Sequence, residues 1–295
     1  MAQAHFELAR TLAKSYERRI DYRAEHLCVA QSMLPHLWRS GALGGRTFDV
    51  LMQRLPVACL EQQSDVAAQL YPQSKTLIEF RAPRWFAEAE QEALQAARTL
   101  FTPHLQIAAL YENAVCLPWE AAPALRDPSA SLRISARGSD DHPSKPKPGL
   151  PGTPTDAART PQHGKHRDLL VFMGPTLARK GAYAVREAIR KTGLSLTVLG
   201  RDLEEPGFWG NLPVTHTSAR ELPWERIHTV VQPALIEYWP RQLLRAHAAG
   251  ANLVVSPPCG MQEDPDAGIH HVPFGDADAL TETLTRLLGR LFHRC

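Results

Sequence analysis

Residues 174–181 (GPTLARKG) are the stretch of this sequence best suited to bind an anion. They follow an apolar run that is typical of a strand and precede a helical pattern, so their amides and the helix dipole favour negative charge. Arg179 and Lys180 add positive charge. The stretch is not a phosphate-binding P-loop, because Arg179 stands where glycine is required and no Ser or Thr follows Lys180. An ordinary strand-to-helix turn with two solvated cations fits the spacing equally well.

Residues 232–240 (QPALIEYWP) are a second strand-to-helix stretch, and Glu237 is their single carboxylate. At the carboxyl edge of a parallel sheet, such a carboxylate could accept hydrogen bonds from sugar hydroxyls. The alternative is a structural role at a helix N-terminus, which stabilises the helix by up to about 1 kcal/mol. A third stretch, residues 256–261 (SPPCGM), also follows a strand and could line the same cleft.

Other chemistry is less well supported. His270 and His271 have no third ligand at metal-like spacing, so an exposed loop pair is expected there and no metal site. His104 is expected to end a strand. The five cysteines are far apart and form no C-x-x-C pair, which predicts a reducing, cytoplasmic location. Hydroxyls, histidines and carboxylates are abundant, and their spacing singles out no Ser/His/Asp or Cys/His set.

A parallel sheet must position the loops described above. In the second half of the chain, short runs rich in Val and Leu alternate with helical patterns, as in doubly wound sheets covered on both faces. We expect strands at residues 169–173, 195–199, 228–232 and 252–256, and helices at 181–191, 240–249 and 277–292, with Asp276 as the N-cap of the last.

The first half alternates in the same way. Residues 41–45 (GALGG) predict a plain turn, and an opening amphipathic helix at residues 6–19 has Leu8, Leu12 and Tyr16 on one face. We expect strands at residues 26–30, 48–52, 76–80, 99–102 and 114–117, and further helices at 57–70 and 84–98. The fold class is therefore α/β, with two Rossmann-like doubly wound parallel-sheet domains.

A segment at residues 120–166 separates these halves. It is rich in Pro, Ser, Gly and Asp and nearly lacks large apolar side chains, so it cannot offset its ordering entropy and is predicted to be a disordered linker. The 295 residues suit two domains of about 150 each. The predicted domains span residues 1–119 and 167–295, although a long insertion within one domain stays possible.

Composition excludes several classes of function. A net charge of +2 gives no broad electrostatic footprint for nucleic acid. No window approaches eighteen uninterrupted apolar residues, so a transmembrane helix is not expected. The opening residues also lack the apolar core of a signal peptide.

In order, the elements of residues 167–290 resemble the donor-binding domain of family 4 glycosyltransferases, enzymes with the two-Rossmann fold called GT-B. The similar stretches are MGPTLARKG, LTVLG, QPALIEYWPRQLLRAHAAGANLVVSP and HVPFGDADALTETLTRLL. The first half is similar more loosely, over ALQAARTLFTPHLQIAAL and AVCLPW, and begins on a polar helix rather than a strand with a Gly-rich turn. The resemblance therefore implies a GT-B-like protein whose first domain is shortened.

The resemblance implies a hexosyltransferase that needs no metal or other cofactor and binds a nucleotide-diphospho-sugar between its domains. The acceptor would be a glycan, a lipid or a small molecule. By this carry-over, Lys180 would hold the diphosphate and stabilise charge on the leaving group. Glu237 would contact the sugar or stabilise the reacting centre, and Gly174 and Gly181 would let the backbone approach the donor.

The sequence also departs from the family pattern. Pro175 stands at the arginine position of the first loop, Ala234 at the serine of a Pro-Ser pair, and Pro240 at a glycine. Arg245 stands at the second glutamate; it could bind an anion but cannot accept a hydrogen bond from ribose. A single charged hydrogen bond contributes roughly 1.5–3 kcal/mol, so several losses could abolish donor binding. The alternative function is thus a catalytically degenerate relative that acts as a non-catalytic partner or scaffold. With either function, the chain could bind a protein partner or form a homo-oligomer.

Overall fold

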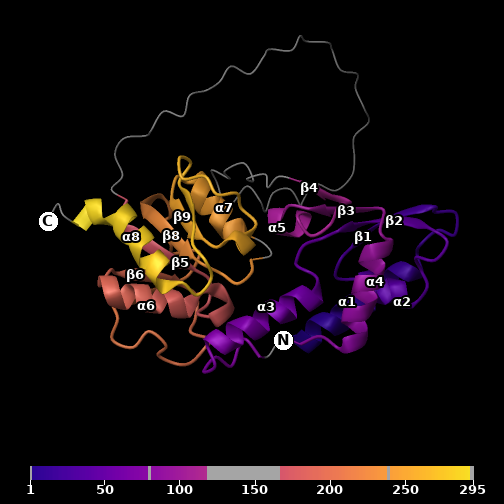
Figure 1. Ribbon diagram of the computed structural model, residues 1–295, viewed down its shortest axis with the longest axis horizontal. Helices are drawn as coiled ribbons and strands as arrows, with labels where there is room; N and C mark the ends of the chain where they lie inside the picture. The colour runs from indigo at the N-terminus through magenta and orange to yellow at the C-terminus, as the bar shows by residue number, and fades with distance from the viewer. Residues whose placement is uncertain (1, 79–80, 118–166, 238–239, 293–295) are drawn as a thin grey trace, which may run out of the picture.

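Two parallel sheets organise the chain, which confirms the predicted α/β class (Figure 1). The computed structural model describes residues 2–78, 81–117, 167–237 and 240–292. The first sheet has the strand order β1-β2-β3-β4, and the second has the order β10-β9-β8-β5-β6-β7. The predicted linker at residues 120–166 lies outside the described residues, so the domain limits stay a prediction. None of the described helices is long and apolar enough to cross a membrane.

The second sheet has the Rossmann strand order. Counted along the chain from β5, its strands lie in the order 3-2-1-4-5-6, and all are parallel. In such sheets the order reverses between the first and fourth strands, here β5 and β8, and ligands bind beyond the carboxyl ends at that point. The strands are β5 (Leu169–Met173), β6 (Leu196–Leu199), β7 (Val214–Thr217), β8 (Ile227–Gln232), β9 (Asn252–Val255) and β10 (Ile269–His271).

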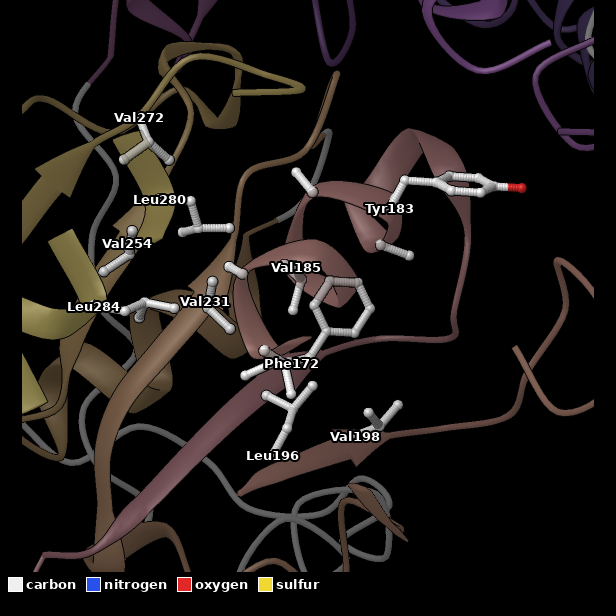
Figure 2. Close-up of a cluster of buried hydrophobic side chains, with 14 of the residues drawn as sticks. Phe172, Tyr183, Val185, Leu196, Val198, Val231, Val254, Val272, Leu280 and Leu284 are labelled. Atoms are coloured by element: carbon white, nitrogen blue, oxygen red, sulfur yellow. The ribbon is translucent and has the colours of Figure 1, made fainter. Parts of the chain in front are cut away.

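Three helices accompany the second sheet: α6 (Ala182–Thr192), α7 (Arg241–Ala248) and α8 (Ala277–Phe292). One face of the sheet packs against α6 and α8, with Phe172 and Val231 facing Val185 and Leu284 in Figure 2. Asp276 caps α8 as predicted, since its Oδ1 accepts hydrogen bonds from the first-turn amides at 3.1 and 2.9 Å. Strands β7 and β10 were not predicted, because they are short and carry exposed polar residues or histidines.

The first sheet contains β1 (His26–Ala30), β2 (Thr47–Leu51), β3 (Thr99–Thr102) and β4 (Ala114–Cys116). The first-half helices are α1 (Ala2–Glu17), α2 (Leu34–Arg39), α3 (Val57–Leu70), α4 (Arg84–Ala96) and α5 (Leu105–Ala108). Helices α1, α2 and α4 lie on one side of this sheet in Figure 1. The expected apolar face of α1 is not buried there: Leu8, Leu12 and Tyr16 are 57%, 43% and 52% exposed, and Ala13 is buried instead.

The predicted strand at residues 76–80 is wrong over its described part. Residues 76–78 form a turn, and the remaining two lie outside the described residues. Leu77 is buried, but in the core cluster of the second half rather than within a sheet. Ala67 joins the same cluster, and in return Ile236 belongs to the core cluster of the first half. Each half thus contributes side chains to the core of the other.

A charged cluster at the start of the first sheet predicts an acid-sensitive contribution to stability. Arg98 donates to both carboxylate oxygens of Asp49, at 3.0 and 2.7 Å, and the His26 ring lies 3.0 Å away. The Arg98 guanidinium, and to a lesser degree His26, lowers the pKa of the Asp49 carboxyl to about 2. Because the folded-state pKa is the lower one, ionised Asp49 stabilises the fold above about pH 4, and this is lost as the pH falls towards 2.

We therefore expect Arg98→Ala to move the midpoint of acid unfolding to higher pH, measured by circular dichroism between pH 6 and 2. Arg84→Ala is the matched control. Its guanidinium pairs with Glu88 but is 92% exposed, and solvent screens such pairs. Equal midpoints for the two variants would contradict the assignment.

Candidate functional site

Two of the three predicted loops meet at the point where the strand order reverses. Lys180, after β5, forms an ion pair with Glu237, after β8, through Nζ and Oε2. Gln232, the last residue of β8, donates from Nε2 to the same carboxylate oxygen at 2.5 Å. The Lys180 and Glu237 side chains are only 18% and 13% exposed. The structure thus brings these two residues together, and Glu237 does not point into open solvent.

Close backbone contact between the loops depends on Gly181. Its φ is +85°, and a Cβ at this position would lie 2.3 Å from the carbonyl oxygen of Pro233. The Leu235 amide also donates to the Arg179 carbonyl at 2.8 Å. There is consequently no room for a side chain at Gly181, and any residue there would push the loops apart.

Gly174 begins the first loop beneath the lysine side chain. Its φ is +124°, and a Cβ there would lie 3.8 Å from Lys180 Cε. The next residue, Pro175, lies against Gly200 at the end of β6, where a Cβ would be 3.1 Å from the Pro175 nitrogen. The Lys180 loop therefore packs directly against the carboxyl end of β6.

A cavity of about 520 Å³ opens beside this contact, beyond the carboxyl ends of β6 and β7. We call it the β6–β7 pocket. The sequence analysis missed it because β7 was not predicted; the one signal was the glycine that ends LTVLG. Its polar lining includes Arg201, His216, Thr217, Ser218 and Glu221.

The third predicted loop lies against the Glu237 loop and against the first half of the chain. The Glu237 amide donates to the Pro258 carbonyl at 3.4 Å, and Gly260 lies against the ring of His104 from the first half. His104 follows β3, as predicted, and is buried. With Ile236 in the first-half core, these contacts place the Glu237 loop between the two sheets.

The loop amides differ from the sequence-based expectation. Ala178 N–H donates to a carboxylate oxygen of Glu204 at 3.0 Å, and the Lys180 and Gly181 amides donate to the Leu177 and Ala178 carbonyls. These three amides are therefore already used within the protein and are not available to an anion in this conformation. The sequence analysis did not identify Glu204, because nothing in its spacing distinguishes it from a surface carboxylate.

Arg245 is not at the Lys180–Glu237 pair. Its side chain is exposed on α7, and the guanidinium lies 4.1 Å from the centre of the Trp224 ring. Trp224 begins the short helical turn before β8, at the edge where the strands begin. Arg245 therefore lies at the edge of the sheet opposite to the Lys180–Glu237 pair. The expected role of Arg245 in donor binding is not supported by this placement.

The two adjacent histidines are not an exposed loop pair. They form the end of β10, where His270 is buried and His271 lies 3.0 Å from the Met261 carbonyl through Nε2. Burial lowers the pKa of His270. Within the part of the chain that the structure describes, no three His, Cys, Asp or Glu side chains are grouped so that they could hold a metal ion.

Comparison with known proteins identifies the fold. No protein-family model and no curated protein matches the sequence. Sucrose-phosphate synthase from Thermosynechococcus elongatus has a similar structure, with a TM-score of 0.61 at 16% identity over 96% of this chain and 69% of that one. The pneumococcal O-GlcNAc transferase GtfA, solved with UDP and GlcNAc, gives 0.51 at 10% identity over 96% of this chain.

The chain in the GtfA/B complex gives a TM-score of 0.52 at 8% identity over 96% of this chain. This protein spans 52% and 53% of the two GtfA-related chains. At such low identity the similarity concerns the fold alone. The protein has the two-sheet GT-B arrangement of glycosyltransferases.

Proposed function

We propose that the protein is a glycosyltransferase that binds a nucleotide-diphospho-sugar and transfers its hexose to a glycan, a lipid or a small acceptor. The observation that supports this most is the Lys180–Glu237 pair, partly buried at the point where the strand order reverses. In open α/β sheets this is where ligands bind. The family 4 resemblance of the second half assigns the same two residues to the donor.

The proposed roles follow from the charges at the pair. Lys180 would leave Glu237 and bind the diphosphate, because an ammonium group stabilises the negative charge that develops on the leaving group. Glu237, freed from the lysine, would accept hydrogen bonds from sugar hydroxyls. The β6–β7 pocket, joined to this loop through Gly200 and Pro175, would take the nucleoside. In the transfer, the bond from the anomeric carbon to the phosphate oxygen breaks, and the nucleoside diphosphate leaves with the electron pair. A bond from the anomeric carbon to the acceptor oxygen forms, and the acceptor's proton passes to the leaving diphosphate.

Thermal unfolding with a panel of nucleotides tests the proposal. UDP, GDP, ADP and their hexose conjugates are each added at increasing concentration, and the unfolding temperature is followed. A true ligand at a hundred times its dissociation constant stabilises the folded state by about 2.7 kcal/mol. The matching nucleoside monophosphates are the control, since they lack the second phosphate and should stabilise less. Absence of stabilisation by every member of the panel would contradict donor binding.

A second candidate is a degenerate relative that supports an active transferase without catalysing transfer. It is favoured by the occupied amides of Ala178, Lys180 and Gly181, by Pro175, which has neither charge nor amide proton, and by the remote position of Arg245. This candidate predicts no nucleotide binding by the isolated chain and co-purification with an active transferase. Release of nucleoside diphosphate from a nucleotide sugar by the purified chain would exclude it.

A further inference from the structure

A buried carboxylate joins three parts of the chain next to the Lys180 loop. Glu204 is 8% exposed and follows β6. Its carboxylate accepts hydrogen bonds from Ala178 N–H at 3.0 Å, from the Tyr183 hydroxyl at 3.3 Å and from the Thr76 hydroxyl at 2.6 Å. Its own amide donates to the Thr176 carbonyl at 3.0 Å, so both its backbone and its side chain hold the first loop.

The Thr76 hydrogen bond comes from the other half of the chain. Thr76 lies in the turn at residues 76–78, where a strand was predicted. Its neighbour Leu77 is buried in the second-half core. Nearby, the Tyr71 ring stacks on Tyr183 with centroids 4.7 Å apart and planes at 15°. Figure 2 shows Tyr183 reaching from α6 away from the rest of the cluster.

We propose that Glu204 is a positioning residue that couples the placement of the first half to the conformation of the Lys180 loop. One carboxylate oxygen, Oε2, accepts hydrogen bonds from both Ala178 and Thr76. A shift of the segment around Thr76 therefore changes the same acceptor that holds the loop two residues before Lys180. That the coupling governs donor binding rests on the function proposed above; the coupling itself does not.

The chemistry of a buried carboxylate makes this coupling strong. An ionised carboxylate that loses a donor in a buried site is left partly unsatisfied, and the remaining donors must compensate. Hydrogen bonds to charged groups are the stronger class, and losing one corresponds to roughly a 10- to 100-fold change in an equilibrium. Loss of the Thr76 hydroxyl should thus loosen the loop at Ala178, two residues before Lys180.

The test replaces Thr76 with valine, which keeps the branched shape and puts a methyl group in place of the hydroxyl that contacts Glu204 and Ser74. Without any nucleotide, hydrogen–deuterium exchange across residues 176–182 is expected to become on the order of tenfold faster. Thr76→Ser, which restores the hydroxyl, should return exchange to the wild-type rate. Thr281→Val is the matched control, because it removes a hydroxyl bonded to the Ala277 carbonyl within α8 and leaves Glu204 untouched.

The outcomes separate the two proposals. Unchanged exchange at residues 176–182 in a folded Thr76→Val protein would overturn the coupling, as would equal acceleration in Thr281→Val. Faster exchange with rescue by serine supports it, even if the wild type binds no nucleotide, in which case only the proposed function fails. Where a nucleotide sugar does bind, its dissociation constant should rise about tenfold in Thr76→Val and return to the wild-type value in Thr76→Ser.

Discussion

Replacing Lys180 with methionine should weaken nucleotide-diphospho-sugar binding by a factor of 10 to more than 100, the equivalent of about 1.5–3 kcal/mol for one charged hydrogen bond. Methionine keeps an unbranched side chain of similar length and removes the ammonium group. With Pro175 neutral and three of the loop amides occupied, the Lys180 ammonium is the positive group that the ion pair with Glu237 holds at this point of the sheet. Titration calorimetry with the best ligand of the nucleotide panel measures the loss.

This substitution also removes the ammonium group that pairs with the Glu237 carboxylate, and losing one partner of a partly buried ion pair destabilises the fold. The double variant Lys180→Met/Glu237→Gln separates the two effects, because the glutamine is neutral. We expect the double variant to regain stability over Lys180→Met while its nucleotide affinity stays low. Wild-type affinity in either variant would show that the diphosphate binds elsewhere.

The second large effect is expected from Gly181→Ala. The positive φ of +85° strains any L-residue by roughly 1–2 kcal/mol, and the new Cβ would lie 2.3 Å from the Pro233 carbonyl oxygen. Overpacking of this kind adds about 1–3 kcal/mol, so we expect a total loss of roughly 2–5 kcal/mol in unfolding free energy. Because the substitution forces apart the loops that carry Lys180 and Glu237, the variant should also lose nucleotide binding. Denaturant unfolding and the nucleotide thermal shift measure both losses.

Gly193→Ala is the matched control for this prediction. Gly193 ends α6 with a φ of +67°, but an added Cβ would meet nothing within 4 Å. It should therefore show the backbone strain alone, about 1–2 kcal/mol, and full nucleotide binding. If Gly181→Ala proved no more harmful than Gly193→Ala, the close contact between the two loops would not matter for the site.

Sequence reasoning succeeded where a local pattern decides the structure. The Val- and Leu-rich runs at β5, β8 and β9 are typical of buried strands, and Asp276 caps α8 as its type and place predict. The placement of Lys180 and Glu237 on neighbouring loops also followed, because parallel strands bring the loops at their carboxyl ends together, but their ion pair was not predicted. The resemblance to a known family supplied the order of the elements.

It failed where contacts between distant segments decide. Residues 76–78 are apolar enough for a strand, but Leu77 is buried by the second half, so no sheet partner is needed. The role of Glu204 depends on a hydrogen bond from Thr76, which lies 128 positions away in the chain and which no local pattern predicts. Arg245 was misplaced because its position in an aligned pattern says nothing about the Trp224 ring that attracts its side chain.

The exchange of core side chains between the halves makes their folded states depend on each other. Ala67 and Leu77 complete the second-half cluster, and Ile236 completes that of the first. Separating the halves would leave unfilled apolar holes in both, so each fragment made alone should be poorly folded and prone to aggregate. A protease that cuts the intervening stretch should instead yield two pieces that stay associated and melt in a single transition.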